Sequence, residues 1–195
     1  MATLPTGQFI GGRWTDDEPT IDVINPATGK VLTKIADASV AQGLEALDAA
    51  VAAQDSWGRT EPRVRAEILR RAFELLQERA DDFALCMTLE MGKTLSEARG
   101  ELNYGAEFFR WFSEEACRIE GRFSMAPSGN TRLLTMKQPV GPAFAITPWN
   151  FPLAMGTRKI GPALAAGCTI VVKPAHETPL TTLLLMRALE DAGVP

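Results

Sequence analysis

The chain has 195 residues, of which 46% are hydrophobic and 23% charged, the balance of an ordinary soluble globular protein and not of a disordered or collagen-like one. Its 20 basic and 24 acidic residues give a net charge of −4 without any basic block, which argues against nucleic acid as a partner. One histidine and three cysteines without a Cys-x-x-Cys pair leave no spacing typical of a metal site.

The cysteines and one uncharged segment bear on where the protein works. Cys86, Cys117 and Cys168 are odd in number and stand in hydrophobic sequence, so we expect reduced thiols and a cytoplasmic protein. The segment 138–157 carries no charge, but it contains four prolines. Because these would leave backbone groups unsatisfied in lipid, we do not expect it to cross a membrane.

The first sixty residues predict small β elements followed by a helix. Phe9–Trp14 has the pattern of a hairpin around two glycines, and a short strand is expected at Val31–Ile35. From Asp37 the apolar period becomes helical, with Asp37 or Ser39 as the cap. The apolar residues that recur at this spacing are Val40, Leu44, Leu47 and Val51.

Two more amphipathic helices are predicted before residue 120. The first extends from about Glu61 to Met91, and Gly92 is its natural end. A Thr94–Glu97 capping box then begins the next helix. Three long amphipathic helices in a row predict a helical layer. The apolar face of the last one contains Leu95, Ala98, Leu102, Ala106, Phe109, Phe112 and Ala116.

The last third of the chain alternates between strand and helix. Short connections between such elements predict a parallel sheet. Two parallel strands alone do not make a stable doubly wound sheet, so we expect the chain to be the front part of a longer protein. The expected elements are a strand at 131–138, a strand at 141–147, a helix over 152–166 closed by Gly167, a strand at 168–172, and a helix opened by a Thr178 cap with Pro179.

The segment Thr147–Pro152 follows the first of the two parallel strands, at the end where open α/β sheets bind ligands. Asn150 in this segment has an amide that could donate a hydrogen bond to a developing oxyanion. It could equally cap the helix that follows, because asparagine is among the residues favoured at that position. The pattern alone leaves both roles open.

A second polar segment, Lys173–Thr178, follows the second parallel strand. Lys173 there would suit an anionic or hydroxyl-rich ligand such as a dinucleotide, although a plain surface lysine is the commoner case. The usual G-x-G-x-x-G fingerprint is absent from the chain, so any dinucleotide would be held differently. His176 has no orienting partner in sequence, which makes it a poor general base.

Arg158 and Lys159 lie about two turns into the helix after Pro152. They could form a solvated face, or the Arg158 guanidinium could clamp a substrate carboxylate. None of the three cysteines has a nearby histidine, so we interpret all of them as structural thiols.

Several motifs, in order along nearly the whole chain, resemble the aldehyde dehydrogenase superfamily. Within it, the segments 89–101, 111–116 and 157–159 most resemble succinate-semialdehyde dehydrogenases. The motifs are Asn25–Gly29, Glu90–Lys93, Thr147–Pro152, Gly161–Gly167 and Val172–Ala175.

This resemblance implies NAD(P)-dependent oxidation of an aldehyde to an acid through a cysteine thiolate and a glutamate-activated water. It implies an α/β fold in which an N-terminal helical layer with β elements leads into an incomplete parallel-sheet, Rossmann-like cofactor-binding domain. The implied parts are a helical part of that domain at 1–120, an extended segment used in oligomerisation at 121–140, and the first βαβα of the cofactor-binding domain at 141–195.

The resemblance also assigns roles to residues of the chain. Asn150 and Lys159 would be catalytic, with Asn150 as an oxyanion donor. Arg158 and Phe151 would contact the substrate, Arg158 by pairing with the distal carboxylate of a semialdehyde. The implied cofactor-binding residues are Ile146, Thr147, Trp149, Asn150, Lys173, Pro174, Ala175 and His176.

Two departures from the family pattern affect these expectations. The family's catalytic cysteine and glutamate belong to regions beyond residue 195, so we expect this chain to be inactive alone. His176 stands where members that prefer NAD often have glutamate, which slightly favours NADP over NAD. The alternatives are an enzyme for betaine aldehyde or glutarate semialdehyde, or a non-catalytic fragment. A complete enzyme of this kind would be a homodimer or homotetramer with a small aldehyde as substrate.

Overall fold

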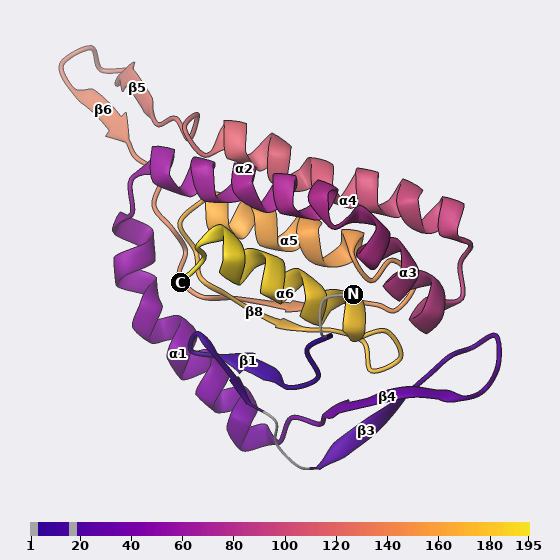
Figure 1. The fold of residues 1–195 in the computed structure, drawn as a ribbon. Coiled ribbons are helices and arrows are strands. Elements are labelled where there is room, and N and C mark those ends of the chain that lie inside the picture. Colours follow the sequence, from indigo (N-terminus) through magenta and orange to yellow (C-terminus); the bar gives the residue numbers. More distant parts are fainter. Residues whose placement is uncertain (1–3, 16–18) are drawn as a thin grey trace.

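A computed structural model describes residues 4–15 and 19–195 (Figure 1). Its N-terminal part contains two antiparallel hairpins. The predicted hairpin around two glycines is confirmed: β1 (Gln8–Ile10) pairs with β2 (Arg13–Thr15). The predicted strand is also confirmed as β4 (Val31–Ala36), but its partner β3 (Thr20–Ile24) was not expected from the sequence.

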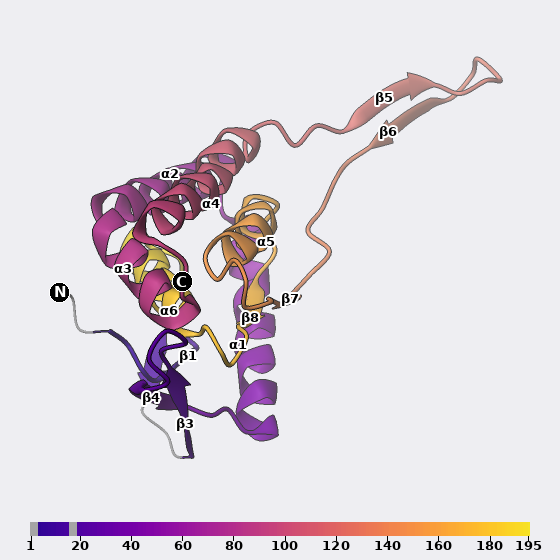
Figure 2. The same cartoon turned by 90° about the vertical axis from the view of Figure 1, so that its right-hand side faces the viewer.

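Helix α1 (Val40–Arg59) is present as predicted, and Ser39 is its cap, because the Ser39 hydroxyl accepts from the backbone N–H of Gln42. The expectation that α1 belongs to the helical layer through its apolar stripe is wrong. Val40 and Leu44 are 84% and 57% exposed, and the helix stands to one side of the layer (Figure 2).

The opposite face of α1 makes the contacts instead. It buries Ala50 and Trp57, and the Gln54 amide bonds to Gly167 O and to the backbone N–H of Thr169, each at 2.9 Å. The face of α1 with small alanines and with the two Gln54 hydrogen bonds therefore packs against β8. The larger side chains of the stripe are on the opposite face and point outward.

The single helix predicted from Glu61 to Met91 is two helices. α2 (Pro62–Glu78) and α3 (Ala80–Met91) meet at Arg79, whose φ of −104° and ψ of 21° lie outside the helical range. The break turns α3 away from the axis of α2, so that it packs against both α4 and α6. Gly92 ends α3 as predicted, with the left-handed φ of 88° that glycine tolerates best.

Helix α4 (Leu95–Glu115) begins at the predicted capping box, in which Thr94 and Glu97 satisfy each other's backbone N–H groups. The predicted apolar face is buried except at Leu95, which is half exposed, and at the partly buried Phe112. Gly105 on this face lets α4 approach the helix α5 closely, because a Cβ there would lie 3.3 Å from atoms of Leu153 and Ala154.

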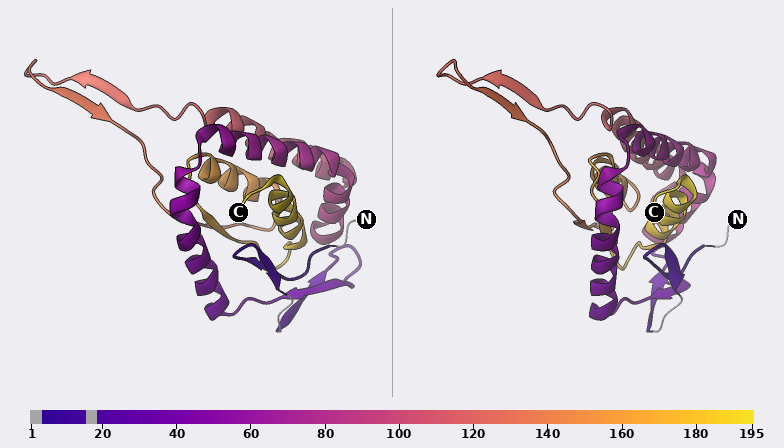
Figure 3. Two further views of the ribbon diagram at one scale, coloured as in Figure 1. Left: turned by 60° about the vertical axis from the view of Figure 1, so that its left-hand side comes forward. Right: turned by 90° about the vertical axis from the view of Figure 1, so that its left-hand side faces the viewer.

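After α4 the chain forms a hairpin of β5 (Arg122–Met125) and β6 (Arg132–Thr135), and β6 is the core of the strand predicted at 131–138. The hairpin projects away from the rest of the molecule (Figures 2 and 3). Its side chains include the exposed Phe123 and Leu134.

The predicted parallel pair is confirmed. β7 (Ala143–Ile146) and β8 (Ile170–Lys173) run in the same direction, with Ile146 opposite Lys173 at their carboxyl ends. Helix α5 (Ala154–Ala165) connects them, and α6 (Leu180–Ala192) follows β8. The expected Thr178 cap on α6 is wrong, because no side chain of the preceding turn caps this helix.

The hydrophobic core is built mostly from α2 to α6. Its largest fully buried side chains include Phe83 of α3, Phe109 of α4 and Leu185 of α6. α5 and α6 therefore pack in the same core as the helical layer.

The domain boundaries expected at residues 120 and 140 remain predictions. The first expected part, 1–120, includes residues 1–3 and 16–18, which the structure does not describe. Among the described residues no helix is both long and apolar enough to cross a membrane.

Candidate functional site

The two segments singled out in the sequence meet at the carboxyl end of the β7–β8 pair. The backbone N–H of Thr147 donates to Lys173 O at 3.2 Å, which continues the parallel ladder by one residue. Beyond it, the buried Thr178 hydroxyl donates to Trp149 O, also at 3.2 Å. These two hydrogen bonds join the two loops, as the order of the strands predicts.

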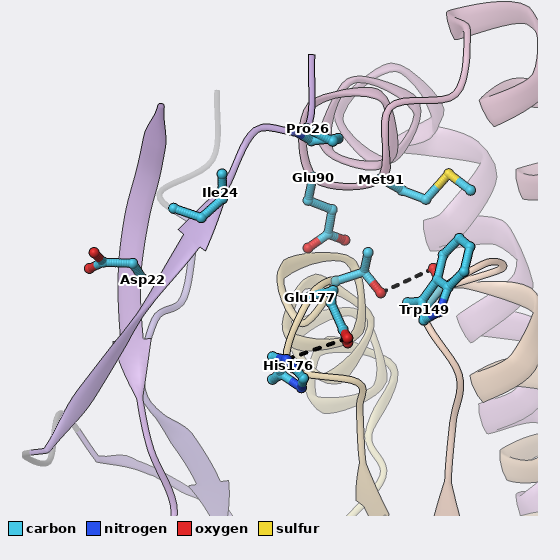
Figure 4. A pocket seen from close by; sticks show the side chains of 9 residues that line it. Asp22, Ile24, Pro26, Glu90, Met91, Trp149, His176 and Glu177 are labelled. Atoms are coloured by element: carbon cyan, nitrogen blue, oxygen red, sulfur yellow. Dashed lines mark hydrogen bonds and ion pairs between the residues drawn. The ribbon is translucent and has the colours of Figure 1, made fainter. Parts of the chain in front are cut away.

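A cavity of about 510 Å³ opens beside these loops. Asp22 and Ile24 of β3 lie on one side of it, and Glu90, Trp149 and His176 lie across from them (Figure 4). The remaining lining residues are Pro26, Met91, Glu177 and Thr178.

The structure brings only part of the predicted site to this cavity. Trp149 and His176 line it, whereas Asn150 and Lys173 do not. Lys173 is exposed, and its Nζ donates to Pro174 O at 3.1 Å. His176 is also exposed, with Nε2 at 3.4 Å from the carboxylate of Glu177.

Asn150 does not cap the helix that follows it, which removes one of its two possible roles. The backbone N–H groups of Leu153 and Ala154 at the start of α5 donate instead to Oε1 of Glu101, at 2.9 and 3.1 Å. The Oδ1 of Asn150 is buried and has no hydrogen-bond partner among the described residues. A buried acceptor without a partner calls for an explanation, and a ligand that donates a hydrogen bond to this oxygen is one.

Lys93 contacts the turn that contains Asn150 and Phe151. Its ammonium forms an ion pair with Glu101, donates to Asn150 O at 3.3 Å, and lies 4.4 Å from the centre of the Phe151 ring. The side chains of Lys93 and Glu101 are 9% and 1% exposed, so this ion pair lies inside the molecule.

Helix α6 is capped in the same way by a second buried glutamate. The carboxylate of Glu90 accepts from the backbone N–H groups of Leu180 and Thr181 at 2.7 and 2.8 Å. Burial raises the pKa of Glu90 to about 7, although these hydrogen bonds favour the ionised form. Glu90 therefore replaces the Thr178 cap that the sequence suggested.

The other predicted residues have ordinary surroundings in this chain. Ile146 and Phe151 are exposed, whereas Ala175 is partly buried. Arg158 is exposed on α5, with its guanidinium 5.8 Å from the centre of the Phe108 ring. The partly buried Lys159 donates to Met155 O at 3.3 Å.

The cysteines differ from one another. Cys86 and Cys168 are buried, and burial raises the pKa of the Cys86 thiol, which makes it unreactive. Cys117 is exposed just after α4, so the expectation of hydrophobic surroundings is wrong for this residue. It stands after the last buried position of α4, where the chain leaves the core.

Sequence reasoning missed the roles of Glu90, Lys93 and Glu101. One signal was available for Glu101: it lies three residues after Ala98 and four before Gly105, on the buried face of an amphipathic helix. A charged residue at such a position usually has a specific partner. The partners themselves lie too far away along the chain for any local pattern to identify them.

The parallel strand–helix–strand unit defines an α/β protein, and its polar loops lie at the carboxyl edge, where open sheets of this type bind ligands. The model of the aldehyde dehydrogenase family matches residues 14–195. The chain belongs to this family.

Curated relatives and solved structures refine this result. The chain is 59% identical over 165 residues to a succinate-semialdehyde dehydrogenase of Paenarthrobacter nicotinovorans, covering 85% of the chain and 37% of that protein. It is 48% identical over 197 residues to "Succinate-semialdehyde dehydrogenase [NADP(+)] 1" of Schizosaccharomyces pombe, covering 100% and 40%. It is also 48% identical over 189 residues to a glutarate-semialdehyde dehydrogenase of Pseudomonas putida, covering 96% and 39%.

The crystal structure of succinate-semialdehyde dehydrogenase from Burkholderia pseudomallei superimposes with a TM-score of 0.96 at 46% identity. It is covered to 41%, and this chain to 100%. The chain thus spans about two fifths of the length of the relatives it matches.

Proposed function

We propose that the full-length enzyme containing this chain oxidises a carboxylated aldehyde, succinate semialdehyde, to the acid with NADP+ or NAD+. The observation that carries this proposal is the carboxyl edge of β7–β8. There, the amide of Asn150 stands on one loop without capping α5, and the exposed Lys173 stands at the end of β8, where the other loop starts. The names of the similar relatives support the choice of a semialdehyde.

The residues at this edge fit a dinucleotide. Ile146 and Trp149 are 62% and 52% exposed, an apolar surface at the strand end that suits a flat nicotinamide ring. Lys173 is exposed, and its ammonium, which donates only to Pro174 O, has further N–H groups for ribose hydroxyls or phosphate oxygens. Bound there, the cofactor would supply the hydride acceptor, while the protein orients the substrate beside it.

The chain's own side chains would act on the aldehyde oxygen and on the far end of the substrate. The amide N–H of Asn150 would donate to the oxygen as it becomes negative, a role worth about 10²–10³ in turnover. Arg158 is the proposed partner of the substrate carboxylate, and Phe151 is proposed to contact the substrate as well. Lys159, one residue further along α5, is proposed as a second catalytic residue for the oxidation of the aldehyde.

His176 bears on which cofactor is used. Its exposed imidazole lies in the middle of the loop between β8 and α6, where a carboxylate would otherwise bind a ribose hydroxyl, which supports room for the 2′-phosphate of NADP+. Glu177 beside it keeps NAD+ possible. Comparing kcat/KM for the two cofactors in the enzyme and in His176→Glu tests this preference.

We also propose that the β5–β6 hairpin takes part in assembly into a homodimer or homotetramer. It projects from the body and exposes apolar side chains on both strands. An isolated hairpin with exposed apolar residues is stabilised by a partner surface.

The test of substrate class compares Arg158→Ala with wild type in the full-length enzyme. We expect KM for succinate semialdehyde to rise at least roughly tenfold, because a hydrogen-bonded charge pair is worth about 1.5–3 kcal/mol. KM for butanal, which lacks the carboxylate, should change little. Arg110→Ala is the matched control, since Arg110 lies 5.5 Å over the Phe73 ring as Arg158 lies over Phe108. Equal effects of Arg158→Ala on both aldehydes would contradict a carboxylated substrate.

Glutarate semialdehyde is the second candidate, because its carboxylate would meet Arg158 in the same way. The 48% identical relative that bears this name supports it. The ratio of kcat/KM for the two semialdehydes distinguishes them.

A further inference from the structure

The turn that contains Asn150 is held on both sides by one ion pair from the helical layer. Lys93 follows the Gly92 end of α3, and Glu101 lies in the second turn of α4. The Lys93 ammonium bonds to Asn150 O at 3.3 Å. Oε2 of Glu101 pairs with this ammonium, and Oε1 accepts from the backbone N–H groups of Leu153 and Ala154.

Stability alone is a weak reason for this arrangement. Two charges lose most of their hydration when they are buried to 9% and 1% exposure, and a buried ion pair often contributes no more than packed apolar side chains would. What a buried pair with fixed partners provides is one defined geometry. Here that geometry fixes the carbonyl of residue 150 and the first N–H groups of α5 at the same time.

The Asn150 side chain needs such support from its backbone. Its Oδ1 is buried without a partner in the described part of the chain, so no hydrogen bond to this oxygen holds the amide in place. The position of the amide is then set by the backbone of residue 150. A displacement of about 1 Å in a catalytic constellation can cost about 10²-fold in rate.

We propose that Lys93 and Glu101 are positioning residues, which hold the backbone at Asn150 so that its amide meets the reacting aldehyde oxygen. This inference rests on the proposed function, in which Asn150 is the oxyanion donor. Neither residue touches the substrate. Lys93 also lies against the Phe151 ring and Glu101 caps α5, so we expect the effect on kcat to pass through Asn150 and any effect on KM to pass through these other contacts.

The experiment is a kinetic cycle in the full-length enzyme with Lys93→Met, Asn150→Ala and the double variant. We expect Lys93→Met to lower kcat roughly tenfold while the Kd for NADP+ stays within twofold of wild type. In the Asn150→Ala background, Lys93→Met should lower kcat no further, because the donor it positions is gone. Lys93→Arg should restore most of the kcat.

Arg79→Met is the matched control. Arg79 also forms an interhelical ion pair, with Asp191 at 2.6 Å, but it does not contact the turn at residue 150. We expect this variant to lower stability without changing kcat. Circular dichroism confirms folding, and if Lys93→Met does not fold, Glu101→Gln replaces it in the same cycle.

The outcomes separate the two proposals. An enzyme that oxidises no aldehyde at all contradicts the proposed function. An active enzyme in which Lys93→Met leaves kcat unchanged, or lowers it by the same factor with and without Asn150, overturns the positioning role alone.

Discussion

Helices α5 and α6 begin alike but are held differently. Each starts at the end of a loop that follows a parallel strand, and in each a buried glutamate from the helical layer accepts from two backbone N–H groups. Glu101 has Lys93 as its ion-pair partner. Glu90 forms no ion pair with any residue that the structure describes, and its pKa rises to about 7.

The difference shows what a counter-charge does at a buried cap. A carboxylate at a helix N-terminus is favoured by the N–H groups and by the helix dipole, but burial disfavours its charge. At α5 the ammonium of Lys93 offsets the loss of hydration. At α6 only hydrogen bonds do so, which leaves the α6 cap sensitive to pH near neutrality.

Removing the counter-charge at α5 should have the largest effect. Lys93→Met leaves Glu101 buried and unpaired, so we expect the free energy of unfolding of the 195-residue chain to fall by about 3–5 kcal/mol. Urea denaturation measures this. Adding Glu101→Gln, which keeps an acceptor oxygen without a charge, should recover most of the loss. A loss under about 1 kcal/mol would mean that the pair is not buried in solution.

The α6 cap should make stability depend on pH. The folded-state pKa of about 7 lies above the ordinary 4.5, so the folded chain keeps a proton on Glu90 that the unfolded chain releases. The stabilisation from this group is complete below pH 4.5 and is lost as the pH rises through 7, by roughly 3 kcal/mol in all.

Glu90→Gln should therefore flatten the change in stability between pH 5 and pH 8, as followed by urea denaturation across that range. Glu97→Gln is the control, because the backbone N–H of Thr94 lowers the pKa of Glu97, whose contribution is lost only as the pH falls. The account of the α6 cap fails if Glu90→Gln keeps the wild-type slope.

Local caps were predictable from the sequence and these two were not. The partners of Ser39 and Thr94 lie three residues away, within the reach of a sequence pattern. The bonds of Glu101 and Glu90 to α5 and α6 span 52 and 90 residues, so only the folded chain reveals them. The glutamates were visible in the sequence, but their partners were not.

Periodicity likewise predicted the helices better than their packing. It identified α1, but it could not show that Ala50 and Trp57 pack inward while Val40 and Leu44 face outward. For the site, the strand order correctly predicted that the two loops meet. It could not predict that Trp149 lines the cavity, because that depends on side-chain conformation.

We propose that the carboxyl edge of β7–β8 binds the dinucleotide through Lys173. The measurement is the Kd for NADP+ of the full-length enzyme by calorimetry, with Lys173→Met compared with Lys30→Met, an exposed lysine between β3 and β4 that does not line the cavity. If Lys173 binds the dinucleotide, the Kd should be at least roughly tenfold higher in Lys173→Met and unchanged in Lys30→Met, because a hydrogen bond from a charged group is worth about 1.5–3 kcal/mol. An unchanged Kd in Lys173→Met would contradict it.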